Sequence, residues 1–192
     1  MAGPYLSTVC LNDGREVCVK WLAPGDLPAV LEFVAGLDEA DLSYLNQDLK
    51  DIPAMSNRLE RLDEGRLRVL AAFDPENGDR MTGYAYLMCG LWAAAHRAAV
   101  ECFLLPAYRD LGLGSTLLRE VAAAAKAAGL MQLQAEIHVD KKEHIAAFKR
   151  LGFELKAILE DYRVDRHGRP YDVIILLKRL RYPSTQDFLY KY

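Results

Sequence analysis

Hydrophobic and polar positions repeat along this chain with two different periods, one typical of strands and one of helices. Residues 16–21 alternate, as a half-buried strand does, and residues 27–34 carry an apolar stripe at helical spacing. Asp26 stands immediately before this stripe, which predicts that its side chain caps the helix. A second helix is predicted over residues 54–63, where apolar residues again recur at helical spacing.

The rest of the pattern predicts a mixed sheet with helices on both faces, an α/β (α+β) fold. Turn-forming residues at 74–79 separate two apolar runs, which predicts a hairpin. The predicted strands are 67–73, 81–89, 98–105, 131–139, 154–165 and 170–179, and the predicted helices are 112–128 and 143–151. Because no linker or repeat interrupts this order, residues 1–192 are interpreted as one domain with a core of about 16–180 and a tail at 181–192.

Composition narrows the classes of function. The net charge of −3 disfavours a nucleic-acid or membrane-surface partner, and no apolar run approaches the ~20 residues that span a bilayer. The N-terminal residues lack the pattern of a signal peptide, so a cytoplasmic protein is expected. The four cysteines are scattered without metal-ligand spacing, so we expect free thiols and no metal site.

Candidate chemistry is concentrated in the turn from Leu105 to Ser115, which follows a strand and precedes a helix. The first amides of a helix lack partners within it, and the helix dipole favours an anion there. Gly112 and Gly114 leave those amides accessible, and Arg109 adds a positive charge. The spacing fits neither a Walker P-loop nor the dinucleotide fingerprint. A pyrophosphate cradle is therefore predicted, the alternative being a tight structural turn.

Three segments resemble the GCN5-related N-acetyltransferase (GNAT) family. Arg109-x-x-Gly112-x-Gly114 is similar to the family's Q/R-x-x-G-x-G/A motif, FKRLGF (148–153) to its "LYEKLGF", and VKWLAPGDLPAVLEF (19–33) to its first strand and helix. The resemblance covers about residues 16–180, and residues 161–180 look most like ribosomal-protein alanine and phosphinothricin-type acetyltransferases. It implies a mostly antiparallel sheet that is splayed at its centre, and acetyl-CoA as co-substrate without a metal.

The resemblance also implies where acetyl-CoA binds. Backbone groups of Phe103, Leu104 and Leu105 are expected to pair with the pantetheine arm as an added strand would. The amides of Leu111 to Ser115 are expected to hold the pyrophosphate, and the positions of Lys141 and Phe148 are assigned to the cofactor site as well. The cofactor residues assigned in this way are Phe103, Leu104, Leu105, Arg109, Asp110, Leu111, Gly112, Leu113, Gly114, Ser115, Lys141 and Phe148.

Two of these positions depart from the family pattern. Lys141 stands where the family often has Asn, and Phe148 stands where it often has the Tyr that protonates the leaving thiolate. Phe cannot donate a proton, but a thiol with a pKa near ~8.5 can leave as the thiolate. The identity of the acid is therefore open.

An attacking amine must lose a proton, and carboxylates are the first candidates to take it. Glu136, on the polar side of the strand at 131–139, is the first candidate base, and Glu101 on the neighbouring strand is the second. Each has a structural alternative, a solvent-facing residue for Glu136 and an ion pair with a nearby arginine for Glu101. His138 shares the face of Glu136, and Tyr162 is a candidate acid in place of Phe148.

The acceptor is expected to be a small-molecule or peptide amine. Residues 37–51 hold five acidic residues and one lysine, a net charge of −4, which favours a cationic amine if they line the acceptor site and otherwise marks a solvated loop. Two other functions remain open. One is an acyl-CoA-binding regulatory module, and the other is an interaction protein whose aromatic tail at 181–192 docks on a partner. A homodimer is kept as one possible assembly.

Overall fold

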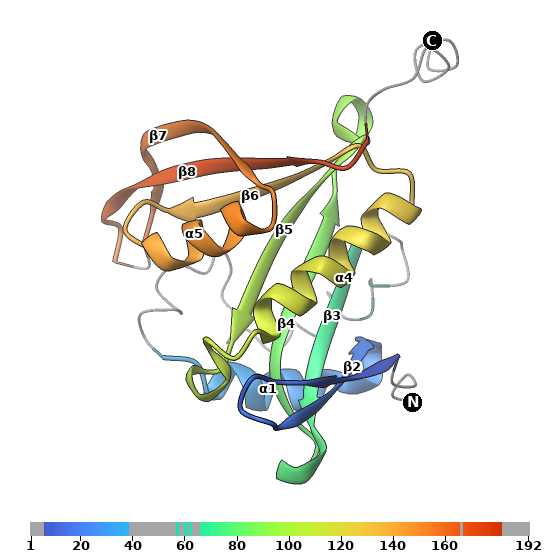
Figure 1. The fold of residues 1–192 in the computed structure, drawn as a ribbon. Coiled ribbons are helices and arrows are strands. Elements are labelled where there is room, and N and C mark those ends of the chain that lie inside the picture. Colours follow the sequence, from blue (N-terminus) through green and yellow to red (C-terminus); the bar gives the residue numbers. More distant parts are fainter. Residues whose placement is uncertain are drawn as a thin grey trace.

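The protein folds around one eight-stranded sheet with helices on both faces (Figure 1). The computed structural model describes residues 6–38, 57, 60, 62, 66–165 and 167–181. The strands are β1 (Ser7–Cys10), β2 (Glu16–Trp21), β3 (Leu67–Asp74), β4 (Arg80–Cys89), β5 (Arg97–Leu104), β6 (Gln132–His138), β7 (Glu154–Val164) and β8 (Pro170–Arg179). The helices whose bounds fall within the described residues are α1 (Leu27–Ala35), α4 (Leu113–Ala127) and α5 (Lys142–Arg150). None of the helices in this part of the chain is long and apolar enough to span a membrane.

The strand order is β1-β2-β3-β4-β5-β6-β8-β7, and every neighbouring pair is antiparallel except β5 and β6. The predicted mixed, mostly antiparallel sheet is confirmed, and the predicted strands and helices lie within a residue or two of the observed ones. The hairpin around residues 74–79 forms between β3 and β4. The predicted helix at 54–63 falls almost entirely outside the described residues.

The sequence pattern missed strand β1. Its four residues are too short for a clear alternation, and they are mostly exposed. They are nevertheless paired antiparallel with β2 over all four positions. Backbone hydrogen bonds to β2 therefore hold β1 in the sheet, although β1 has no buried apolar face.

The predicted side-chain cap at Asp26 is wrong. Asp26 stands at the N-cap position of α1, but its carboxylate makes no cap hydrogen bond. Its oxygens instead accept from Lys20 Nζ at 2.8 Å and from the Ala23 amide at 2.9 Å. Lys20 and Asp26 are both buried, and a buried ammonium group needs a counter-charge more than a helix end needs a cap.

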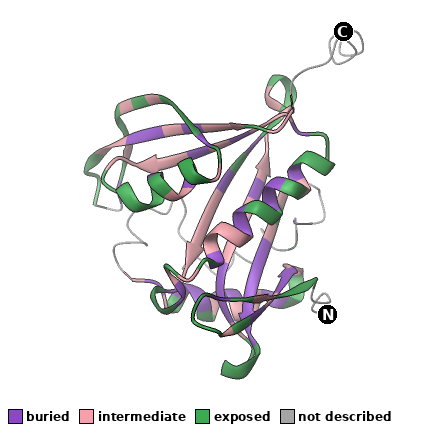
Figure 2. Cartoon of the chain, viewed as in Figure 1, coloured by how far each residue is buried: buried purple, intermediate pink, exposed green. Residues whose placement is uncertain are grey.

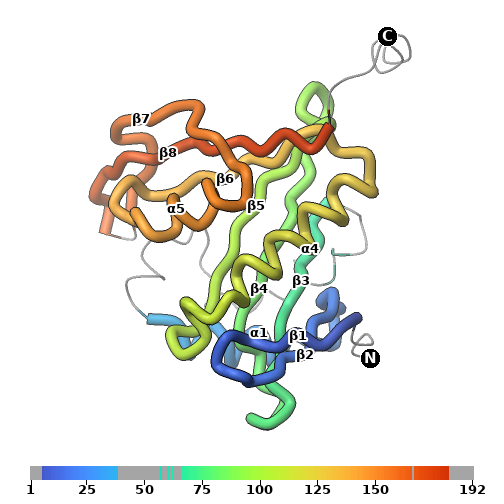
Figure 3. Tube along the Cα trace, in the orientation of Figure 1, coloured from blue at the N-terminus to red at the C-terminus, as the bar shows by residue number. Residues whose placement is uncertain are grey.

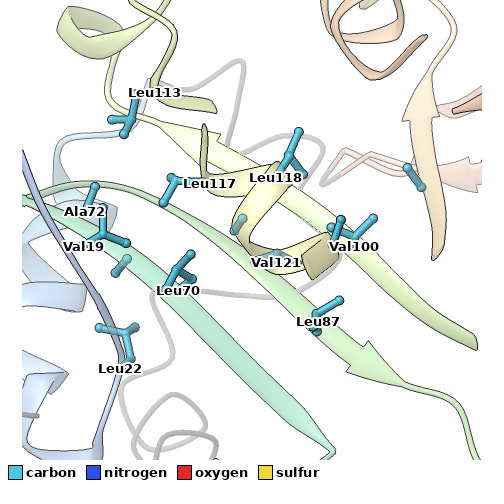
Figure 4. Close-up of a cluster of buried hydrophobic side chains, with 14 of the residues drawn as sticks. Val19, Leu22, Leu70, Ala72, Leu87, Val100, Leu113, Leu117, Leu118 and Val121 are labelled. Carbon is cyan, nitrogen blue, oxygen red and sulfur yellow. The ribbon is translucent and has the colours of Figure 1, made fainter. Parts of the chain in front are cut away.

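The core lies mainly between the sheet and α4. This helix crosses β3, β4 and β5, whereas α1 packs on the opposite face of β4 (Figure 1). Figure 2 shows burial concentrated on β3, β4 and the sheet-facing side of α4. The side chains that fill this layer are labelled in Figure 4 and include Leu70, Leu87, Val100, Leu117 and Val121.

Candidate functional site

The sheet opens between β5 and β6. These parallel strands pair only at Arg97↔Gln132, Ala98↔Leu133 and Ala99↔Gln134, after which β6 pairs with β8 alone. Figure 1 shows the two strands side by side at one end and diverging toward the other. We call this opening the splay. It leaves the second half of β5, residues 100–104, without β6 along its edge.

Hydrogen-bonding direction decides which β5 groups face the splay. The Leu105 amide donates to Thr82 O at 2.9 Å, so Leu105 is directed toward β4. Because successive residues of a strand point their backbone groups in opposite directions, Cys102 and Leu104 direct theirs toward the splay. Of the three residues expected to pair with a pantetheine arm, Leu104 is the one whose carbonyl faces it. Phe103 is directed toward β4 with Leu105.

The predicted cradle follows β5 directly. A short 3₁₀ turn, Pro106–Tyr108, leads to a turn in which Asp110 has a φ of 59° and Gly112 a φ of 86°. Gly112 is the N-cap of α4, and the first bond of that helix runs from the Thr116 amide to Gly112 O. The amides of residues 113–115 precede this bond at the N-terminus of α4, where helix amides can bind an anion.

Gly114 tests whether these residues fit a bound cofactor. A Cβ added at Gly114 would lie 3.3 Å from Leu104 Cδ1 and 3.6 Å from Cys102 Sγ, in the angle between β5 and α4. Glycine at this position therefore lets the first turn of α4 lie close against β5. The turn thus places helix N-terminal amides next to the open edge of β5, an arrangement that fits a phosphate-bearing, extended molecule.

Arg109 lies within this cradle but points back toward the sheet. Its Nε and Nη2 donate to Leu104 O at 3.3 and 3.2 Å, and its Nη1 lies 3.4 Å from Asp38 Oδ2. Arg109 therefore contacts the carbonyl that faces the splay. It also links the cradle to the end of the α1 segment, where the acidic stretch 37–51 begins; most of that stretch lies outside the described residues.

Glu101 and Glu136 lie on one face of the sheet, on opposite sides of the splay. Ala98 and Leu133 are partners in the β5–β6 pairing, and both are buried toward the helical layer of α4. Strand alternation then directs Glu101 and Glu136 to the other face, which is the face of α1. Both candidate bases from the sequence therefore lie on the α1 face of the sheet, and their roles stay a prediction.

Glu136 is held by two neighbours. Arg163 Nη2 donates to Glu136 Oε2, and Gln134 Nε2 donates to Glu136 Oε1 at 2.9 Å. Partial burial acts to lower the pKa of Arg163, but the hydrogen bond and charge of Glu136 raise it above its ordinary value. A proton taken up by Glu136 must therefore go to a remaining lone pair of its carboxylate.

Tyr86 on β4 faces Glu101 across the β4–β5 pairing and hydrogen-bonds to its carboxylate. Burial, reinforced by the charge of Glu101, raises the pKa of this hydroxyl above its ordinary value, so it stays protonated at neutral pH. Sequence reasoning missed both Tyr86 and Arg163. The alternation of Tyr84 and Tyr86 along β4 could have revealed the first, since it puts both rings on one face.

The remaining predicted residues lie around the C-terminal strands. Tyr162 falls in a bulge of β7 between Leu159 and Arg163, where 53% of its surface is exposed. Phe148 is buried in α5 and packs edge-on against Phe153 at 4.9 Å. Lys141 is the N-cap residue of α5.

The imidazole of His138 is held in a fixed orientation. It stacks on Tyr171 at 4.7 Å, and its Nδ1 accepts from the Asp140 amide at 3.0 Å. In the neutral ring the proton then sits on Nε2. His138 is therefore a donor through Nε2, on the same face as Glu136.

Cys102 borders the splay, but burial raises the pKa of its thiol to about 12. A thiol with this pKa remains protonated at neutral pH and is a poor nucleophile. Within the described residues, no group of three or more His, Cys, Asp or Glu side chains gathers closely enough to hold a metal ion.

Comparison with known proteins agrees with this geometry. A family model described as an acetyltransferase (GNAT) domain matches residues 43–175, well over half of the chain. The chain belongs to the GNAT acetyltransferase family. No curated protein matches it. The splay and the glycine turn are thus features of a GNAT domain in this chain.

Solved structures resemble this GNAT chain over most of its length. Ribosomal-protein-alanine N-acetyltransferase from Brucella melitensis is 25% identical, with a TM-score of 0.73 over 84% of this chain and 98% of that one. A phosphinothricin acetyltransferase from Sinorhizobium meliloti, solved in complex with AcCoA, is 22% identical, with a TM-score of 0.73 over 88% and 94%. Ribosomal-protein-S5-alanine acetyltransferase from Vibrio fischeri is 14% identical, with a TM-score of 0.74 over 85% and 92%.

Proposed function

We propose that this protein is an N-acetyltransferase that moves the acetyl group of acetyl-CoA directly onto a primary amine. The observation that carries the proposal is the splay. It combines a strand edge at residues 100–104, a helix N-terminus at one end and two carboxylates on one face. Membership of the GNAT family and the AcCoA complex of the Sinorhizobium meliloti relative support the same reading.

In this proposal acetyl-CoA supplies a thioester and binds mainly through backbone groups. The Leu104 carbonyl accepts from the pantetheine arm once the Arg109 guanidinium turns away from it. Arg109 is then available to the pyrophosphate, which the amides of residues 111–115 bind at the positive end of α4. Phe103, Leu105 and Asp110 shape the backbone of this path, and Lys141 and Phe148 border it from α5.

The chemical step is a direct attack. The amine nitrogen forms a bond to the acetyl carbon, the carbon–sulfur bond breaks, and the thiolate of CoA leaves. A lysine-like amine has a pKa around 10.4 and an α-amine about 7.8, so most acceptors arrive protonated. Glu136 is the first candidate to take that proton and Glu101 the second, and a base in this role contributes typically ~10²–10⁴-fold.

Protonation of the thiolate needs a donor other than Phe148. Tyr162 is the candidate that the sequence offers, and it lies exposed in the β7 bulge. Tyr86 lies beside Glu101 on the α1 face of the sheet, but its raised pKa makes it a weaker acid than an ordinary tyrosine, so it is not the expected donor. A thiolate with a pKa near ~8.5 also leaves without full protonation, so this step tolerates a weak acid.

We further propose that the acceptor is cationic, because the segment 37–51 carries a net charge of −4 and begins beside the cradle at Asp38. The ion pair of Glu136 with Arg163 offsets part of the negative charge on the sheet. The apparent KM for the acceptor should rise between ~0.1 and ~1 M salt, as the Debye length falls from about 10 to about 3 Å. A preference for neutral or anionic amines, with a salt-independent KM, would contradict this proposal.

The direct test is a screen of amine acceptors with acetyl-CoA, read as release of free CoA. Diamines, basic amino acids and peptides with free N-termini should give turnover, and acetyl-CoA binding should be measured in parallel by calorimetry. The departures at Lys141 and Phe148 favour one alternative, an acyl-CoA-binding regulatory module. Tight binding without turnover on any amine would support that module.

A further inference from the structure

The turn between β1 and β2, residues 11–15, lies against the turn that follows β5. We call this second turn, residues 107–112, the cofactor turn. The Asn12 amide donates to Leu111 O at 3.1 Å, and Arg15 Nη2 donates to Ala107 O at 2.8 Å. Figure 3 shows these two segments side by side although almost a hundred residues separate them. The hairpin turn thus contacts the cofactor turn near both of its ends.

Arg15 makes the more extensive contact. Its guanidinium lies 4.5 Å from the centre of the Tyr108 ring, and its Nε donates to Asp13 Oδ2 at 2.7 Å. Tyr108 is buried, and its hydroxyl donates to Asp74 Oδ2 at 2.5 Å. Asp74 in turn accepts from the amides of Glu76 and Asn77 after β3. Arg15 therefore connects the start of the cofactor turn, through Tyr108, to Asp74 at the end of β3.

The cofactor turn needs such support because of its backbone. Asp110 adopts a left-handed φ of 59°, a conformation that is unfavourable for a non-glycine residue and persists where the surroundings enforce it. Gly112 follows at a φ of 86°, and a Cβ placed there would lie 3.4 Å from Asn12 Oδ1. Asn12 thus flanks the residue at which α4 begins.

We propose that Arg15 and Asn12 are positioning residues that preorganise the 107–112 turn for the pyrophosphate of acetyl-CoA. The proposal rests on the proposed function. Backbone amides bind a phosphate well only if their directions are set before the ligand arrives, because ordering them on binding reduces the affinity. The hairpin turn sets these directions from outside the Arg109–Gly114 motif.

Arg15→Ala tests the proposal with two ligands, measured by calorimetry on the full chain. Acetyl-CoA carries the pyrophosphate, and S-acetylpantetheine has the same thioester arm without it. Losing the guanidinium contacts should raise the Kd for acetyl-CoA about tenfold, since a hydrogen bond from a charged group contributes about that factor, and should leave the Kd for S-acetylpantetheine unchanged. Arg15→Lys, which keeps the charge but not the planar stacking, should fall between Arg15→Ala and the wild type.

Arg68→Ala is the matched control, because Arg68 also covers an aromatic ring, that of Trp21 at 4.0 Å, but away from the cofactor turn. It should leave both Kd values unchanged. Equal weakening of both ligands by Arg15→Ala would mean that Arg15 only supports the fold. Unchanged Kd values would mean that the cofactor turn keeps its conformation without Arg15. Either result overturns the proposal. A wild-type protein that binds no acetyl-CoA would instead refute the proposed function itself, and the inference with it.

Discussion

The two sides of the splay are built in different ways. On the β1–β5 side, strands β3 and β4 are largely buried, and α4 covers them with apolar side chains. On the β6–β8 side, the edge strand β7 is mostly exposed, and the sheet carries the polar contacts of Glu136, Gln134 and Arg163. The first side thus offers a firm backbone platform, and the second offers side-chain chemistry. The two sides therefore differ in packing and in polarity, although they belong to one continuous sheet.

The largest effect should come from the two carboxylates that lie on one face of the sheet, on opposite sides of the splay. Glu136→Gln keeps the size of the side chain but removes its basicity, so kcat at neutral pH should fall about 10²–10⁴-fold while acetyl-CoA affinity stays nearly constant. The rate should recover at high pH, where the amine loses its proton unaided.

Two further variants separate the base from its ion pair. Arg163→Met breaks the ion pair but leaves the Glu136 carboxylate in place, so it should reduce kcat far less than Glu136→Gln. Glu101→Gln is the parallel change on β5. If kcat and its pH profile are unchanged in Glu136→Gln but altered in Glu101→Gln, Glu101 is the base.

The two sides should also differ in their contribution to stability. Leu117 is fully buried between α4 and the sheet, and Leu117→Ala should lower the free energy of unfolding by about 2–5 kcal/mol. Ile158 on β7 is 54% exposed, and Ile158→Ala should cost about 0.5 kcal/mol or less. Urea unfolding of both variants measures the contrast. Equal losses would show that β7 is covered in solution, as it would be in a homodimer.

A charge placed in the cradle should weaken the cofactor without disturbing the other side. Gly114→Glu introduces bulk beside Leu104 and a negative charge at the expected pyrophosphate position, so the Kd for acetyl-CoA should rise about 100-fold or more. Ala123→Glu, on the exposed side of α4, is the control and should bind normally. Unchanged affinity in a folded Gly114→Glu protein would locate the cradle elsewhere.

The smallest effect is a pH-dependent one in the turn between β7 and β8. The Arg169 amide, followed by the Arg169 side chain and the His167 amide, lowers the pKa of Asp165 to about 2. The unfolded carboxyl has a pKa near ~3.9, so the stabilisation is present above about pH 4 and is lost as the pH falls toward 2.

Asp165→Asn should therefore be less stable than wild type at pH 7, and the difference should disappear near pH 2. Unfolding curves at pH 7, 4 and 2.5 measure it. Glu120→Gln on the exposed side of α4 serves as the reference and should show no such dependence. A difference that persists unchanged at low pH would mean that the substitution acts through packing and not through charge.

The sequence predicted the platform better than the chemistry. Strands such as β2 and the glycine turn at 112–114 are encoded locally, by alternation and by residues that tolerate unusual backbone angles. The contact of Arg163 with Glu136 depends on the β7 bulge and on a register across β8, and neither is visible in one segment of sequence. The predicted cap at Asp26 was wrong for a similar reason. Asp26 pairs with Lys20, and that pairing depends on the burial of both side chains in the folded protein.

The cradle and the splay also bear on how such a protein can diverge. Most substitutions change a side chain and leave the peptide group as it was, so a site made largely of amides and carbonyls survives changes at nearly every position that forms it. Gly114 is more restricted, because a side chain there would crowd those of Leu104 and Cys102. In the proposed site, substitutions are therefore tolerated where backbone groups bind acetyl-CoA, and changes of side chain alter the choice of acceptor.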